Sequence, residues 1–257
     1  MMPPHSGYGR LGTLGIATPQ ANPAAEPEFR ALLPRGVSCA TVRMHSNIEA
    51  PDQRLMAYFE ELGSTLSRFD TLTLSAVGVA CTGSSYLLGY ERTAQLIQAL
   101  SDKIGIPIIT AAAAIEEALL TLGAKRISLV SPYPDWLSEA AKDYWSGRGF
   151  ELVDCFSLAQ TQGDTRAIYA LDGATAAESI NQHWKGIEAD AYLITGTGLP
   201  TLPFIAELTR TTVKPVLTSN LCLAWCCLKT ANIEFGEHHP SKEMPLLAGW
   251  EAAVARL

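Results

Sequence analysis

The sequence predicts an α/β protein of two similar lobes, each with a parallel sheet, related to one another by pseudo-two-fold symmetry. Short apolar runs alternate with helix-compatible segments along most of the 257 residues, which is typical of parallel sheets covered by helices on both faces. The order of turns also occurs twice, because Pro132 follows Pro19 by 113 residues and Gly196 follows Cys81 by 115. This pairing indicates an internal duplication.

Four strands are predicted in the first half, because each is a short apolar run that ends at a turn signal. Pro19 and Pro23 prevent the first strand from continuing, and Gly123 ends the last helix. The strands are expected at Leu14–Thr18, Val37–Arg43, Leu72–Ala80 and Ile106–Thr110. The helices are expected at Glu26–Leu33, Pro51–Phe69, Tyr90–Ile104 and Ala112–Leu122, the second with Leu55, Tyr58, Phe59 and Leu62 on one apolar face.

The second half repeats this alternation from Arg126. The strands are expected at Ile127–Ser131, Glu151–Ser157, Ala191–Thr195 and Pro215–Thr218. The helices are expected at Trp136–Arg148, Ala174–Trp184, Leu202–Thr209 and Asn220–Lys229. Each crossover helix belongs to the sheet that it covers, so the last helices should pack back onto the first lobe. We therefore predict a first lobe of residues 1–112 and 219–257 and a second lobe of residues 113–218.

The stretch from Ala80 to Ser85 places a thiol at the end of a predicted buried strand. Gly83, Ser84 and Ser85 can leave backbone N–H groups free at the N-terminus of the next helix, where they would stabilise a carboxylate or a thiolate. A buried structural cysteine is the alternative, because free cysteine is among the most buried residue types. The duplication favours a functional role for Cys81.

A ligand site is predicted between the two lobes. In open parallel sheets, ligands bind beyond the carboxyl ends of the strands. If the two lobes face each other, the turns at Pro19 and Cys81 form one wall and the turns at Tyr133 and Gly196 form the other. Cys81 would then lie on one wall of a shared cleft.

Composition favours a small-molecule ligand. The net charge is −7, and no cluster of Lys and Arg could neutralise successive phosphates, so a nucleic-acid partner is disfavoured. No apolar run reaches the roughly 18 residues needed to span a bilayer, and the first ten residues lack the apolar segment of a signal peptide. We expect a cytoplasmic protein that does not associate with membranes.

The six cysteines predict neither a disulfide framework nor a metal site. Cys222, Cys226 and Cys227 lie close together, but the only pair that could complete a zinc site is His238-His239 in a polar stretch beside Pro240. We interpret those histidines as solvated residues.

Five motifs in this order resemble the aspartate/glutamate racemase superfamily, and most of all its maleate cis–trans isomerase and arylmalonate decarboxylase branch. They are TPQAN at 18–22, ACTGS at 80–84, SPY at 131–133, TGTGLPTL at 195–202 and PVLTSN at 215–220. The resemblance covers about residues 14 to 229. It implies two flavodoxin-like lobes, a cytoplasmic enzyme that needs no cofactor, and a small carboxylic acid as substrate, with homo-oligomerisation left open.

The resemblance also implies roles for particular residues. In racemases of the superfamily two cysteines face each other across the substrate, and Cys81 matches the first of them. The second position is Gly196, so a two-thiol racemase is disfavoured, and Gly196→Cys is expected to restore the second thiol. The arylmalonate decarboxylases carry one cysteine and one glycine in the opposite arrangement. The predicted substrate-binding residues are Pro19, Asn22, Thr82, Gly83, Tyr133, Gly196, Thr197 and Asn220.

Two one-thiol reactions and one non-catalytic role remain open. In an isomerase, the Cys81 thiolate adds to the double bond of an unsaturated acid, the resulting single bond rotates, and elimination gives the other isomer. In a decarboxylase, Cys81 delivers a proton to an enediolate after carbon dioxide leaves. The polar segment Val42–Ser46, with Arg43 and His45, favours the isomerase if it lines the cleft. A carboxylate-binding pseudoenzyme is the third hypothesis.

Overall fold

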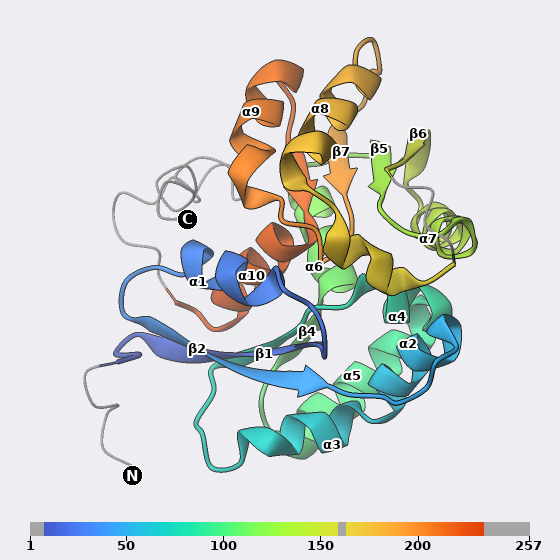
Figure 1. Ribbon diagram of the computed structural model, residues 1–257. Helices are drawn as coiled ribbons and strands as arrows, with labels where there is room; N and C mark the ends of the chain where they lie inside the picture. The colour runs from blue at the N-terminus through green and yellow to red at the C-terminus, as the bar shows by residue number, and fades with distance from the viewer. Residues whose placement is uncertain (1–7, 159–162, 234–257) are drawn as a thin grey trace.

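The computed structural model describes residues 8–158 and 163–233. Within them the chain forms two four-stranded sheets with the same strand order, β2-β1-β3-β4 and β6-β5-β7-β8, and every pairing is parallel. Figure 1 shows the sheet of β1 and β2 in the lower part of the view and that of β5, β6 and β7 in the upper part. The predicted α/β fold of two duplicated lobes is confirmed.

The strands begin and end close to their predicted bounds. Strand β3 is the exception, because it begins at Ala76 and the chain before it makes no ladder. The strands are β1 Gly12–Pro19, β2 Val37–Met44, β3 Ala76–Val79, β4 Ile108–Thr110, β5 Arg126–Ser131, β6 Glu151–Ser157, β7 Ala191–Ile194 and β8 Val216–Thr218. Strands β3, β4, β7 and β8 are buried along their whole length, as expected for the interior of a parallel sheet.

Helices cover the sheets, and α10 packs against α1, α6 and β3. The α-helices are α1 Ala25–Leu32, α2 Pro51–Glu60, α3 Leu62–Leu66, α4 Thr82–Leu88, α5 Tyr90–Ile104, α6 Ala111–Thr121, α7 Asp135–Gly147, α8 Gly173–His183, α9 Leu202–Thr212 and α10 Ser219–Thr230. Two short 3-10 helices are η1 Ser67–Phe69 and η2 Thr165–Ala170. The boundaries of the two predicted lobes stay a prediction.

The helices differ from the prediction in three places. The helix expected over 51–69 is divided into α2, α3 and η1. Helix α4 begins at Thr82, directly after Cys81, and Gly89 with φ +80° separates it from α5. Because a positive φ is easily adopted only by glycine, Gly89 can end one helix and start the next. The helix η2 has no hydrophobic period and was not predicted.

None of the described helices combines the length and the apolar character that a membrane span requires. The pair His238-His239 lies outside the described residues.

Candidate active site

Cys81 lies between β3 and α4, at the carboxyl end of its sheet. It is the N-cap residue of α4, and it is 4% exposed. Its Sγ is 3.2 Å from Ser84 Oγ, and Ser84 Oγ donates a hydrogen bond of 2.7 Å to the Leu55 carbonyl oxygen. Since the single serine proton goes to that carbonyl, the Cys81 thiol is the donor to Ser84. Cys81 is therefore protonated in this hydrogen-bond arrangement.

The surroundings of Cys81 act on its pKa in two directions. Burial raises the pKa of the thiol, while the N–H groups of Ser84 and Gly83 lower it, and the net result is a pKa above the ordinary value. Burial disfavours the thiolate, and the helix N-terminus and its N–H groups favour it. The groups that would stabilise a thiolate are thus already in place around a thiol.

Tyr133 joins the second lobe to the Cys81 turn. It follows β5, it is 6% exposed, and its hydroxyl is 2.5 Å from Thr82 Oγ1 on α4. Burial holds the pKa of Tyr133 well above its ordinary value, so the phenol keeps its proton near neutral pH. Tyr133 and Thr82 therefore form a pair of hydroxyl groups next to the thiol, one from each lobe.

Thr197 makes a second connection between the lobes. Its hydroxyl donates to the carbonyl oxygen of Ala80, 2.7 Å away, and accepts a hydrogen bond of 3.1 Å from Asn22 Nδ2. Ala80 is the residue before Cys81 in the chain. Thr197 is therefore held against the Cys81 turn by two residues of the first lobe.

A buried carboxylate, that of Glu28, is linked to Thr197 through the side chain of Asn220. Glu28 on α1 is 2% exposed and accepts hydrogen bonds from the N–H groups of Thr201 and Leu202, at 2.5 and 2.8 Å, and from Asn220 Nδ2 at 2.7 Å. The same amide nitrogen of Asn220 donates to the Thr197 carbonyl oxygen at 3.0 Å. Glu28 was not predicted from the sequence, because charged residues are rarely buried and its neighbours carry no motif.

A small cavity of about 40 Å³ lies next to Cys81. Among the predicted site residues, those that line it are Pro19, Cys81, Thr82, Gly83, Tyr133 and Thr197. Asn22, Gly196 and Asn220 are not in its lining, and both asparagines are 1% exposed and hydrogen-bonded to Thr197. Direct contact of these three residues with a substrate stays a prediction.

The rest of the lining was missed. It consists of Arg54, Leu55, Tyr58, Leu137, Thr165, Arg166, Ile168, Tyr169 and Gly198. Leu55 and Tyr58 had been predicted on the apolar face of one helix, which also suits a core position. Arg166, Ile168 and Tyr169 belong to η2, and six residues of 3-10 helix carry no recognisable period.

A cysteine at Gly196 would strain the backbone and press against two side chains. Its φ is +91°, and an added Cβ would lie 2.5 Å from Ile168 Cδ1 and 2.6 Å from Pro132 Cγ. Such approaches are far inside van der Waals contact, so the neighbours would have to move. The expectation that Gly196→Cys restores a second thiol stays a prediction, and it requires Ile168 and Pro132 to shift.

Gly196→Ala is expected to destabilise the protein more than Gly186→Ala. Gly186 has a similar φ of +83° but open space around its Cβ position, so it isolates the backbone strain. That strain costs about 1–2 kcal/mol, and overpacking at Gly196 adds about 1–3 kcal/mol. Urea unfolding of both variants measures the difference. Equal losses would show that Ile168 and Pro132 yield freely.

Comparison with known proteins places this site in a family. Residues 56–242 match the family model described as arylmalonate decarboxylase. The chain belongs to the arylmalonate decarboxylase family. The predicted branch of the aspartate/glutamate racemase superfamily is thereby confirmed.

Individual members of the branch are similar along most of the chain. A maleate isomerase from Pseudomonas putida is 27% identical over 88% of this chain and 94% of its own length. The arylmalonate decarboxylase of Bordetella bronchiseptica is 25% identical over 68% of this chain and 72% of its own. A variant of the Nocardia farcinica maleate cis-trans isomerase, solved with a covalently bound succinylcysteine intermediate, superposes with a TM-score of 0.74 at 21% identity, covering 86% of this chain and 93% of that one.

In this member of the arylmalonate decarboxylase family, the polar segment Val42–Ser46 does not line the cavity. The Arg43 guanidinium instead pairs with Glu26 and donates to the Asn22 carbonyl oxygen at 2.9 Å. Because it does not line the cavity, this segment does not favour the isomerase over the decarboxylase. Within the described residues, no three His, Cys, Asp or Glu side chains are grouped to hold a metal ion.

Proposed function

We propose that the protein is a cofactor-independent isomerase that interconverts the cis and trans forms of a small unsaturated dicarboxylic acid such as maleate. The observation that carries the proposal is Cys81 at the N-terminus of α4, with its thiol beside the cavity and donors from both lobes around it. The relatives named maleate isomerase support it, and so does the succinylcysteine in the Nocardia farcinica enzyme.

In this mechanism the Cys81 thiol first gives its proton to solvent water, and the thiolate released at the end of the cycle can take a proton back from water. The thiolate then forms a bond to one carbon of the double bond, and the π-electron pair moves into the adjacent carboxylate to give an enediolate. The Tyr133 hydroxyl, which can accept from Thr82 Oγ1, and the N–H groups of Thr82 and Thr197 donate hydrogen bonds to the developing charge. The new single bond rotates, the electron pair returns to form the trans double bond, and the carbon–sulfur bond breaks to release the thiolate.

Decarboxylation is the second candidate. The raised pKa of Cys81 keeps the thiol protonated, and a thiol is what a proton donor to an enediolate must be. Three apolar side chains in the cavity wall, Leu55, Leu137 and Ile168, suit a departing carboxylate that is poorly solvated. The family name supports this reaction, and we rank it second because the maleate isomerase of Pseudomonas putida is similar over more of the chain than the arylmalonate decarboxylase of Bordetella bronchiseptica.

Proton NMR in deuterated water separates the two reactions. We expect conversion of maleate to fumarate, and no deuterated arylacetate from phenylmalonate. Arylacetate without fumarate would support the decarboxylase instead. If neither product formed, the carboxylate-binding pseudoenzyme would be the remaining hypothesis. Thermal stabilisation by either diacid would then measure binding.

The dependence of the rate on pH gives an independent test. In an isomerase the thiolate reacts, so kcat/KM should rise with pH up to the raised pKa of Cys81. In a decarboxylase the thiol donates, so kcat/KM should fall once pH passes that pKa. A profile measured from pH 6 to 10 decides between them.

A small carboxylic acid as partner and a cytoplasmic location belong to the proposal, and homo-oligomerisation stays open.

A further inference from the structure

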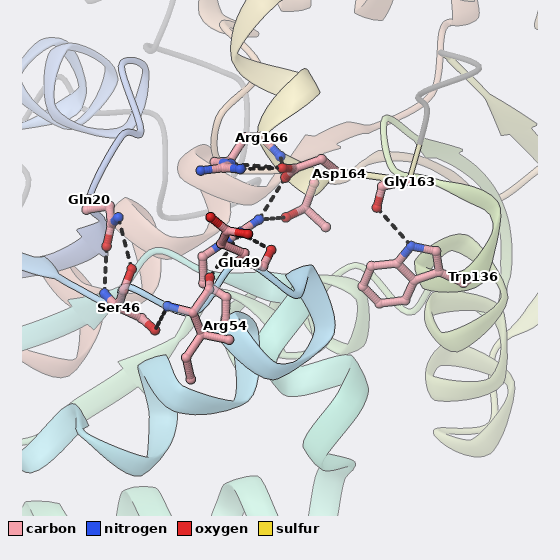
Figure 2. Close-up of polar contacts among 10 residues, drawn as sticks. Gln20, Ser46, Glu49, Arg54, Trp136, Gly163, Asp164 and Arg166 are labelled. Carbon is pink, nitrogen blue, oxygen red and sulfur yellow. Dashed lines mark hydrogen bonds and ion pairs between the residues drawn. The ribbon is translucent and has the colours of Figure 1, made fainter.

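Two arginines contribute to the wall of the cavity next to Cys81. Arg54 on α2 and Arg166 on η2 both line the same cavity as Cys81. The Arg54 side chain is 2% exposed and that of Arg166 is 52% exposed. Figure 2 shows both guanidinium groups directed toward Asp164. A fixed positive charge deep in a cavity of this size needs either an internal partner or an anionic ligand.

Arg54 is held rigidly by the protein. Its Nη1 donates to the carbonyl oxygens of Ile48 and Glu49, at 3.3 and 2.9 Å, and its Nη2 donates to Asp164 Oδ1 at 2.7 Å. These bonds use both terminal nitrogens. Arg54 therefore fixes the position of Asp164 and supplies charge to the wall, rather than being free to move toward a ligand.

Arg166 is held on one edge only. Its Nε and Nη2 donate to Asp164 Oδ2 at 3.0 and 2.6 Å. No partner for its Nη1 is found among the described residues. A single carboxylate thus serves two guanidinium groups, and Arg166 keeps one donor nitrogen available for a ligand. Arginine is suited to binding a carboxylate through such donors.

Two tyrosines connect the arginines to the thiol. Tyr58 and Tyr169 line the same cavity as Cys81 and Arg54. Burial is the main cause that raises the pKa of Tyr58 to about 12 and that of Tyr169 further, so both phenols are neutral near pH 7. The lining of the cavity therefore combines a thiol, neutral hydroxyl groups and two guanidinium groups.

We propose that Arg166, positioned by Asp164 and Arg54, binds a second anionic group of the substrate at the end of the cavity away from Cys81. Arg166 then determines specificity for diacids over monoacids of the same length. This inference rests on the proposed function in that it takes the cavity next to Cys81 as the substrate site. The alternative is that Arg166 only ties η2 to Asp164.

Protection of Cys81 from alkylation tests the inference without any turnover. Succinate and butyrate have the same chain length and differ by one carboxylate, and neither has a double bond. N-ethylmaleimide labels the protein in the presence of each acid, and mass spectrometry of the peptide that contains Cys81 gives the labelling rate. In the wild type, succinate should protect at a concentration about tenfold lower than butyrate, which is the effect expected of one hydrogen-bonded charge pair.

Arg166→Gln should raise the half-protecting concentration of succinate about tenfold and leave that of butyrate within about twofold. Arg166→Lys should lose part of the preference, because the charge remains but the planar fork does not. Arg210→Gln is the matched control, since Arg210 is an exposed arginine of α9 outside the cavity. The Arg210→Gln substitution should leave the half-protecting concentrations of both acids unchanged. A thermal midpoint equal to that of the wild type shows that Arg166→Gln is folded.

Two results would overturn the inference. One is a wild-type protein that succinate protects no better than butyrate. The other is an Arg166→Gln variant, folded by its thermal midpoint, in which the preference for succinate persists. Because the assay needs no reaction, a failure to isomerise maleate would count against the proposed function and leave the test of Arg166 intact.

Discussion

Cys81→Ser should reduce turnover by about a thousandfold or more while the protein remains folded. Serine can make the same hydrogen bond to Ser84 that the thiol makes at 3.2 Å, so the local structure should be kept. Its hydroxyl is a far weaker acid than a thiol and is a poor nucleophile without a base beside it. Both proposed reactions need the sulfur, so both should be lost.

The matched control for this variant is Cys155→Ser. Cys155 is a partly buried cysteine of β6 outside the cavity, and its replacement should leave kcat within about twofold. Steady-state rates and thermal midpoints of the two variants complete the comparison. Substantial turnover by Cys81→Ser, from protein shown by mass spectrometry to carry the serine, would remove Cys81 from the mechanism.

Glu28→Leu should be the most destabilising substitution at the site. It removes the acceptor for two backbone N–H groups at the start of α9 and for the Asn220 amide, all of them buried. Unsatisfied buried donors cost about 1–3 kcal/mol each, and a broken buried charge network costs about 3–5 kcal/mol. We expect a loss of about 3–5 kcal/mol in the free energy of unfolding, measured with urea. Glu178→Leu on the exposed face of α8 should cost little.

Glu28 also predicts how stability depends on pH. Burial raises its pKa above the ordinary value of 4.5, although its hydrogen bonds lower it in part. A carboxyl group with a higher pKa in the folded state binds its proton more tightly there than in the unfolded state. Its contribution to stability is therefore full below pH 4.5 and is lost as pH rises through the folded-state pKa.

Glu28→Gln removes that titration and should flatten this part of the profile. Urea unfolding of the wild type and of Glu28→Gln between pH 4 and 8 measures the difference between the two free energies. If the difference did not change with pH, the carboxyl group would have the same pKa in the folded and unfolded states, against the expectation from its burial.

The parts of the site predicted from sequence are those that strand topology determines. Parallel strands end at one edge of each sheet, so the turns after β1, β3, β5 and β7 had to lie near the site once the strands were recognised. This brought Pro19, Cys81, Tyr133 and Thr197 together correctly. The duplication also predicted two similar lobes, and the two sheets have the same strand order.

Side-chain direction could not be predicted in the same way. Asn22 and Asn220 lie on the expected turns, yet both are directed to Thr197, because a buried amide takes whichever partner satisfies its hydrogen bonds. Arg54 occupies a helix whose other inward residues are apolar, and nothing in the local pattern shows that Asp164, 110 residues away, neutralises it. The sequence could not show that Gly196 has a positive φ or that side chains lie close to its Cβ position.

The central claim is that the sulfur of Cys81 forms a covalent bond to the substrate. Intact-protein mass spectrometry after rapid acid quenching of the protein with maleate tests it most directly, followed by mapping of the modified peptide. We expect an adduct of one maleate per chain on Cys81, formed within the time of one turnover and absent in Cys81→Ser. Fumarate production with no adduct at any quench time, or an adduct confined to another cysteine, would contradict it.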